Sequence, residues 1–216
     1  METKTRFKGT ASAMLRVGAA CIGALGMCGA AHAATCSSLI SVSSDSSTMT
    51  AADSVTPPAT ISGVAVTVPI CRVQGTARPT SDSEIKFEVW LPATIEAWTG
   101  RMKVNGTGGY AGATPYARLG QDVVDGFVSA GSNMGHDGGE NASWTLGHPE
   151  KVKDWGLRAH YYVATAAKTL ADAFYGKPVS YSYFEGCSNG GRQALMMAQN
   201  YPTLFDGIAA GAPSTW

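Results

Sequence analysis

The sequence of 216 residues predicts an α/β fold, in which a mostly parallel sheet has helices on both faces and an antiparallel edge. Three observations support this prediction. Segments 64–71 and 84–91 alternate between apolar and polar residues, as strands of a hairpin do. From residue 126 to residue 212, the patterns of a strand, a helix, a strand, a helix and a strand then follow one another at the spacing of α/β units. Finally, the turn between strand 179–184 and helix 194–200 is rich in glycine, as a sharp bend between strand and helix requires.

Residues 1–33 have the features of a secretory signal peptide. Four basic residues precede a small and apolar run over 17–31, which ends in the cleavage pattern Ala31-His32-Ala33. The run of about 15 residues is too short for a typical transmembrane helix. Cleavage would remove four of 16 basic and one of 16 acidic residues, which leaves a net charge of −3. We therefore expect a secreted or periplasmic protein that binds neither nucleic acid nor membrane.

Two further regions follow the signal peptide. Residues 34–60 are rich in Ser, Thr and Ala and predict an N-terminal extension that is mostly loop. Residues 61–216 are expected to form the N-terminal part of a catalytic domain. Of the cysteines that remain after cleavage, Cys36 and Cys71 are the expected disulfide pair, closing a loop over 41–60. Cys187 is left without a partner within this chain.

The predicted domain is built from short elements around one long helix. In strand 84–91 the alternate residues are apolar and Pro92 follows. The long helix is expected from Asp154 to Tyr175, because its apolar positions lie three or four residues apart and Gly176 follows. The other patterns predict strands over 101–105, 126–130, 179–184 and 207–212, a helix over 194–200 and a glycine-rich loop over 106–112.

Ser188 is the candidate catalytic residue. It stands in Gly186-Cys187-Ser188-Asn189-Gly190, the G-x-S-x-G pattern of the nucleophile elbow in α/β-hydrolases. The glycines let a strand and a helix approach the strained serine. Attack by a serine also requires hydrogen-bond donors for the oxyanion. We expect these donors to be the backbone N–H groups of Asn189 and of Gly108 or Gly109 in the glycine-rich loop.

No residue of this chain is a strong candidate for the base or the acid of a triad. In α/β-hydrolases the acid and then the histidine follow the serine, but only Asp206 follows Ser188 and no histidine does. We expect Asp206 to be a turn residue, His136 and His148 to be loop residues, and His160 to be structural. Either the sequence is truncated before the triad Asp and His, which the unpaired cysteine and the half-built sheet favour, or the protein is a non-catalytic relative.

No metal or cofactor site is predicted. The group His136, Asp137 and Glu140 has suitable residue types but no recognised ligand spacing. The loop 106–112 lacks the Lys-Ser/Thr pair of a phosphate-binding P-loop, and it lacks the G-x-G-x-x-G pattern of a dinucleotide site. The loop therefore fits an oxyanion-binding role better than a phosphate-binding one.

Taken together, these residues resemble the tannase and feruloyl esterase family of secreted serine esterases. The resemblance covers about residues 36–216, and it rests on the segments 106–112, 154–159, 174–178, 186–193 and 205–213. It implies an α/β-hydrolase with Ser188 as the nucleophile of a carboxylic ester hydrolase. The implied substrates are aromatic esters of the feruloyl or galloyl type, such as plant polyphenol or cell-wall esters.

The resemblance also implies features that this chain does not contain. In that family the cysteine before the nucleophile forms a disulfide with a cysteine beside the catalytic histidine, so the partner of Cys187 is expected outside this chain. A lid domain, which often holds calcium, and the C-terminal strands are expected beyond Trp216 as well. The alternative is a secreted hydrolase-like binding protein without catalysis.

Overall fold

The structure is a computed structural model, and it describes residues 34–139 and 141–214. The expected signal peptide, residues 1–33, lies outside the described residues. The strands are β1 Ser43–Ser44, β2 Ser47–Val55, β3 Ala59–Ile61, β4 Val64–Val66, β5 Ile70–Ala77, β6 Ile85–Pro92, β7 Arg101–Asn105, β8 Val128–Ser132, β9 Tyr181–Cys187 and β10 Gly207–Gly211. The α-helices are α1 Tyr116–Val124, α2 Pro149–Lys153, α3 Ala159–Tyr175 and α4 Asn189–Asn200, with 3₁₀ turns at Cys36–Ser41 and Ser143–Thr145 and a π-helical turn at Asp154–Arg158.

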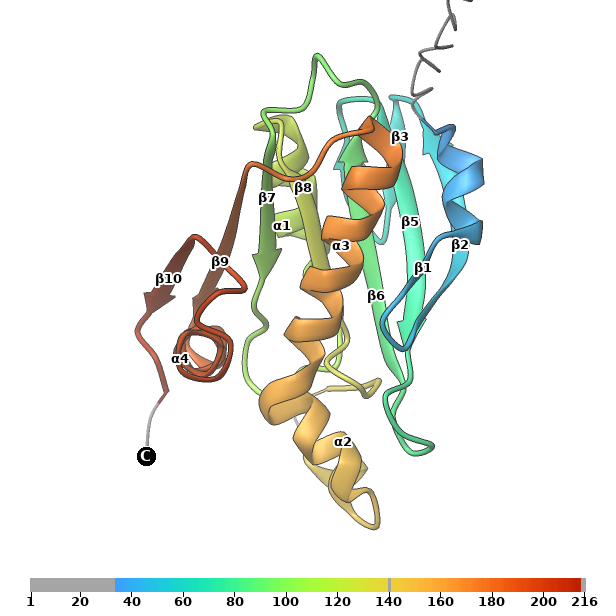
Figure 1. The fold of residues 1–216 in the computed structure, drawn as a ribbon. Helices are drawn as coiled ribbons and strands as arrows, with labels where there is room; N and C mark the ends of the chain where they lie inside the picture. Colours follow the sequence, from blue (N-terminus) through green and yellow to red (C-terminus); the bar gives the residue numbers. More distant parts are fainter. Residues whose placement is uncertain (1–33, 140, 215–216) are drawn as a thin grey trace, which may run out of the picture. The chain divides into compact units, whose positions relative to one another are not determined.

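Eight strands form one mixed sheet in the order β1-β2-β5-β6-β8-β7-β9-β10 (Figure 1). The four strands β8, β7, β9 and β10 pair in parallel. From β8 back to β1 every pairing is antiparallel. A second, two-stranded sheet joins β3 to β4. The expected combination of parallel strands and an antiparallel side is therefore present, and the antiparallel side extends over several strands.

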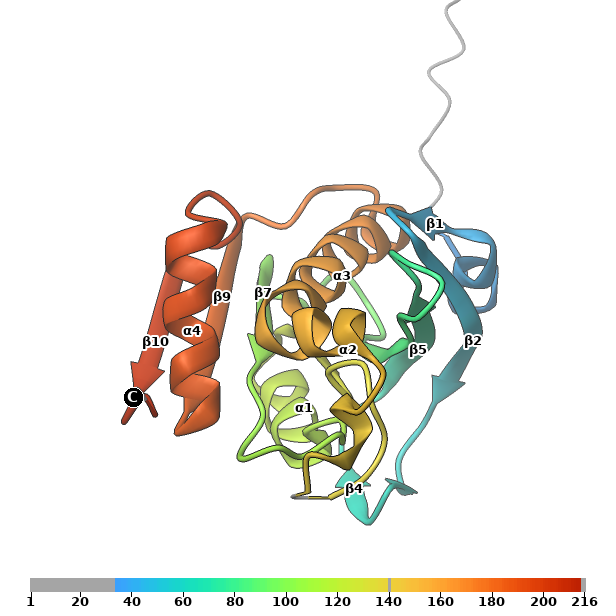
Figure 2. The ribbon, with the colours of Figure 1, turned by 90° about the horizontal axis from the view of Figure 1, so that it is seen from below.

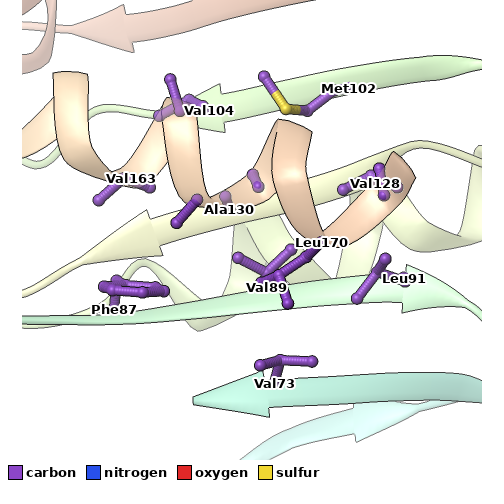
Figure 3. Close-up of a cluster of buried hydrophobic side chains, with 14 of the residues drawn as sticks. Val73, Phe87, Val89, Leu91, Met102, Val104, Val128, Ala130, Val163 and Leu170 are labelled. Atoms are coloured by element: carbon purple, nitrogen blue, oxygen red, sulfur yellow. The ribbon is translucent and has the colours of Figure 1, made fainter. Parts of the chain in front are cut away.

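Helices α1 and α3 cover opposite faces of the sheet (Figure 2). Successive residues of β6 point to opposite faces. Trp90 packs with Leu119 and Val123 of α1, whereas Val89 and Leu91 belong to the core that contains Val163 and Leu170 of α3 (Figure 3). Helix α1 connects β7 to β8 on one face of the sheet, and α3 connects β8 to β9 on the other face. The connecting helices therefore change face at β7, which lies between β8 and β9. This arrangement is the topological switch point at which α/β proteins bind ligands.

The expected loop over 34–60 is wrong. The segment contains β2, a strand of nine residues that pairs along its length with β5. Met49 and Ala52 are buried on its inner face. Thr48, Thr50 and Ser54, which are among the residues that suggested a loop, are tolerated because one side of the strand faces solvent. The segment also belongs to the same compact unit as the rest of the described chain.

Several other predicted elements have different bounds: β8, β9 and α4 each differ from prediction by two or more residues at one end or both. The expected single strand 64–71 is divided between β4 and β5, because Pro69 cannot donate a ladder hydrogen bond and the chain turns there. The expected helix start at Asp154 is five residues late: Pro149 begins α2, and the helical path continues through the π-helical turn into α3. Gly176 does end this helix, with a φ of 68°.

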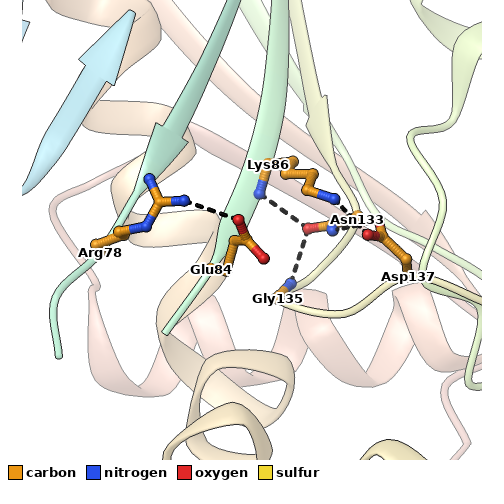
Figure 4. Close-up of polar contacts among 6 residues, drawn as sticks. All are labelled: Arg78, Glu84, Lys86, Asn133, Gly135 and Asp137. Atoms are coloured by element: carbon orange, nitrogen blue, oxygen red, sulfur yellow. Dashed lines mark hydrogen bonds and ion pairs between the residues drawn. The ribbon is translucent and has the colours of Figure 1, made fainter. Parts of the chain in front are cut away.

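The turn after β8 is held to β6 by Asn133 (Figure 4). Its Oδ1 accepts hydrogen bonds from the backbone N–H groups of Lys86 at 3.0 Å and Gly135 at 3.0 Å. Its Nδ2 donates to Asp137 at 2.9 Å, and Lys86 forms an ion pair with the same carboxylate. These contacts fix the point at which the long loop toward α2 leaves the sheet. Within the described residues, no helix has the length and apolar character needed to cross a membrane.

Candidate functional site

Ser188 occupies a sharp turn between β9 and α4. Its backbone has φ 58° and ψ −120°, a conformation that residues with a side chain rarely adopt and that costs about 1–3 kcal/mol. Its N–H donates to the carbonyl of Gly211 at 3.0 Å, and its carbonyl accepts from Arg192 at 3.1 Å and from Ser214 at 3.1 Å. The residue itself is exposed. The neighbouring backbone therefore holds the strained turn, and the serine side chain faces outward.

The elbow depends on glycines because three backbone segments meet there. A Cβ atom on Gly186 would lie 2.3 Å from the carbonyl oxygen of Gly190. On Gly191 it would lie 2.3 Å from the carbonyl oxygen of Gly211, and on Gly106 it would lie 2.8 Å from the Cα of Gly190. These distances are far below ordinary contact, so side chains at these positions would push α4 away from the strands. The glycine pattern in the sequence thus has a direct steric cause.

The glycine-rich loop after β7 lies against the first turn of α4. Gly106 donates to the carbonyl of Glu185 in β9 at 2.8 Å, and Thr107 is buried against the helix. Gly108 is exposed, and no atom lies within 4 Å of the position that a Cβ atom would take. Asn189 is the first residue of α4, where backbone N–H groups have no partner within the helix. The structure thus brings the expected oxyanion donors to one end of the sheet, and their role stays a prediction.

A cleft of about 320 Å³ opens at the carboxyl ends of the parallel strands. The cleft lies at the ends of the neighbouring strands β7 and β9, where the switch point occurs. Its walls come from the glycine-rich loop, the end of β9, the exposed part of β10 and one side chain of α1. The lining residues are Asn105, Gly106, Thr107, Gly108, Arg118, Glu185, Gly186, Cys187, Ala209 and Gly211.

The described histidines all have partners away from Ser188. His136 is hydrogen-bonded through Nε2 to the carbonyl of Tyr110, and burial lowers its pKa. His148 is paired with Asp82 at 2.6 Å. His160 is buried in α3, and burial lowers its pKa to about 4. The structure therefore places none of these three imidazoles as a base for the serine.

Asp206 is the turn residue that the sequence predicts. Its carboxylate accepts hydrogen bonds from the backbone N–H and the hydroxyl of Ser182, at 2.7 and 3.0 Å. These bonds lower the pKa of the carboxyl group. Asp206 therefore joins the start of β9 to the turn before β10, and these contacts lie at the opposite end of β9 from Ser188.

Sequence reasoning missed the contacts of Arg192 and Trp155. The guanidinium donates to the side-chain oxygen of Asn189 at 2.8 Å and to the carbonyl of Gly156 at 3.3 Å. Its central carbon lies 4.3 Å from the ring centroid of Trp155, which in turn stacks on Tyr110 at 5.4 Å. Burial lowers the pKa of Arg192. The only sequence signal was the placement of Arg192 in the helix turn after Ser188 and of Trp155 at the predicted helix start.

The cysteines have the expected states where the structure describes them. Cys36 and Cys71 form a disulfide, which joins the first 3₁₀ turn to β5. Cys187 is an exposed free cysteine, and its expected partner outside this chain stays a prediction. Within residues 34–139 and 141–214, no group of three or more His, Cys, Asp or Glu side chains could hold a metal ion. The calcium that the resemblance implies, in a lid domain outside this chain, stays a prediction.

The strand order, the helices on both faces and the serine elbow define this chain as part of an α/β-hydrolase. Residues 71–216 match the family described as tannase and feruloyl esterase. This match covers more than half of the chain, and the chain belongs to that family.

Relatives and solved structures agree with this assignment. An uncharacterised esterase of Xanthomonas campestris pv. campestris is 40% identical over 202 residues, which cover 91% of this chain and 34% of that protein. The crystal structure of feruloyl esterase B from Aspergillus oryzae superposes with a TM-score of 0.76 at 31% identity, over 82% of this chain and 36% of that one. The tannin acyl hydrolase from Aspergillus niger gives a TM-score of 0.63 at 26% identity, over 78% and 33%. This chain thus spans about a third of the length of these proteins.

Proposed function

We propose that this chain is the nucleophile-bearing part of an exported serine carboxylic ester hydrolase. The observation that carries the proposal is the conformation of Ser188, which is strained, exposed and held by backbone hydrogen bonds beside a glycine-rich loop. Strain of this kind persists where the surrounding structure enforces it, and it is common at catalytic residues. Membership of the tannase and feruloyl esterase family supports the same reaction class.

The proposed reaction proceeds through an acyl-enzyme. The hydroxyl oxygen of Ser188 attacks the ester carbonyl carbon and transfers its proton to a general base. The N–H groups of Asn189 and of Gly108 or Gly109 stabilise the negative charge on the tetrahedral carbonyl oxygen. The ester bond then breaks, and the alcohol leaves with the proton from the base. Water attacks the acyl group in the same manner and releases the carboxylic acid and free Ser188.

We propose that the base and the acid lie in a part of the protein outside this sequence. His136, His148 and His160 all have other partners, and the relatives are about three times as long as this chain. The substrates are proposed to be aromatic esters, since relatives are named feruloyl esterase and tannin acyl hydrolase. Export to the periplasm or the medium is proposed from the basic and apolar N-terminal segment with its Ala-x-Ala end.

The test uses the full-length protein and a fluorophosphonate, which labels activated serines. We expect Ser188→Ala to abolish labelling and the hydrolysis of methyl ferulate and methyl gallate. Ser214→Ala is the matched control, because its backbone contacts the elbow and its side chain has no role in the mechanism. Labelling that survives Ser188→Ala would remove Ser188 from the mechanism. A full-length coding sequence without a later histidine would favour the non-catalytic binding protein instead.

A further inference from the structure

Thr107, the second residue of the glycine-rich loop, is bound to α4 by three of its atoms. Its backbone N–H donates to Oε1 of Gln193 at 3.0 Å, and its Oγ1 accepts from Nε2 of the same amide at 3.0 Å. Its carbonyl oxygen accepts from Nδ2 of Asn189 at 3.4 Å. Thr107 and Gln193 are both buried. The loop is thus attached, immediately before Gly108, to the helix that begins after Ser188.

The orientation of the Gln193 amide follows from its partners. A backbone N–H can only donate, so the amide atom that faces Thr107 N–H must be the oxygen. His160 approaches this oxygen as well, with Nε2 at 3.0 Å. Its Nε2 must therefore carry the proton, which the neutral tautomer provides, and burial favours the neutral imidazole. Two donors on Oε1 and one acceptor on Nε2 hold the amide in a single orientation.

This arrangement divides the loop into a bound part and an available part. The N–H of Thr107 already has a partner, so it is not the donor for an oxyanion. Gly108 follows directly, is exposed and has open space around it. An oxyanion donor must lie within about 0.5 Å of the correct position to act, and a displacement of about 1 Å costs about 100-fold in rate. The amides of Gly108 and Gly109 have no helix or strand of their own to hold them at that precision.

We propose that Gln193, oriented by His160, is a positioning residue that holds the Gly108–Gly109 amides against the elbow of Ser188. This inference rests on the proposed function, because it assigns a role within the same site. Gln193 acts through Thr107 and touches no substrate. Its side chain couples the oxyanion loop to the helix that carries the nucleophile, so that both move as one body.

The experiment compares Gln193→Ala with Gln199→Ala in the full-length protein. Gln199 is an exposed glutamine on the same helix, and it controls for a change of residue type. We expect Gln193→Ala to lower kcat for methyl ferulate by about 100-fold, with KM within about threefold of wild type, because the contact is needed most in the transition state. The rate of fluorophosphonate labelling should fall in parallel. Gln199→Ala should retain wild-type values.

Substitutions of His160 separate positioning from simple packing. Glutamine at this position keeps an N–H donor within reach of Gln193, whereas leucine removes it. We expect His160→Gln to retain kcat within about threefold and His160→Leu to lose at least about tenfold at equal folded fraction. Should Gln193→Ala fail to fold, Thr107→Val removes only the Oγ1 contact and is expected to lower kcat by about threefold to tenfold.

Three results would overturn the inference. One is a kcat of Gln193→Ala, or of Thr107→Val if the first does not fold, that stays near the wild-type value. Another is a loss that only follows the folded fraction, measured by circular dichroism. The third is an equal loss in His160→Gln and His160→Leu. Failure of the proposed function is recognised separately, because Ser188→Ala would then still label and hydrolyse esters.

Discussion

Substitution of Gly186 by alanine tests whether close backbone contact builds the elbow. The added Cβ would lie 2.3 Å from the carbonyl oxygen of Gly190 and 2.4 Å from its carbonyl carbon. An ordinary contact needs about 3.4 Å, so the first turn of α4 must move by about 1 Å. Overpacking of this kind costs about 1–3 kcal/mol, and a displacement of about 1 Å at the reacting group lowers the rate by about 100-fold. We therefore expect Gly186→Ala to reduce both stability and turnover.

The assay measures urea unfolding, fluorophosphonate labelling and ester hydrolysis on the full-length protein. Gly156→Ala is the matched control, because no atom lies within 4 Å of its added Cβ and its φ is ordinary. We expect this control to keep wild-type labelling. Wild-type stability together with wild-type labelling in Gly186→Ala would refute the steric explanation of the G-x-S-x-G pattern.

Three further predictions concern the stability of the described part of the chain. Replacing Cys36 and Cys71 by alanine opens a loop with a sequence separation of 35 residues, and it should lower the free energy of unfolding by about 4 kcal/mol in urea titrations without reductant. A double variant as stable as wild type would contradict this. Glu88→Ala should cost about 3 kcal/mol, since Glu88 is 3% exposed and its carboxylate bonds Arg72, whose partly buried side chain, 22% exposed, would lose its charge partner; a thermal melt at the wild-type temperature would count against it. His160 has an ordinary pKa of 6.5 that burial lowers to about 4, so its stabilising effect is complete above pH 6.5 and is lost as the pH falls toward 4. The loss is on the order of 3 kcal/mol. Unfolding titrations at several pH values should show that the free energy of unfolding depends less on pH in His160→Gln than in wild type. Equal slopes in the two proteins would exclude His160 as the cause of this pH dependence.

Elements with a clear local pattern could be predicted from the sequence. Strand Arg101–Asn105 has the bounds that its pattern predicts, and Gly176 ends α3 as expected. In contrast, the polar strand β2 was predicted as a loop. Its stability comes from hydrogen bonds to β5, which is distant in sequence, and from burial of one face only. Local composition carries no information about such a partner.

The same limit applies to the candidate site. The position of Ser188 at a bend, and the cysteine pair, followed from spacing and residue type alone. The contacts of Gln193 with Thr107, and of Arg192 with Trp155, join residues that lie 86 and 37 positions apart. No periodicity relates such residues, because their meeting depends on how α3 and α4 pack on the sheet.

The sequence by itself determined the family, the order of the strands and the two longer helices from β8 onward, and the residue at the elbow, whereas helix α1 was not predicted. Each of these follows from short segments of the sequence, in which the positions of glycine, the alternation of apolar and polar residues or a motif has a local effect. Only the tertiary structure decided which polar groups surround the elbow, that β2 is a strand and that His136 and His160 are buried. These properties arise when segments that are distant in sequence pack together and exclude water. The partners of a hydrogen bond and the burial of an imidazole both depend on which residues lie nearby in the folded chain.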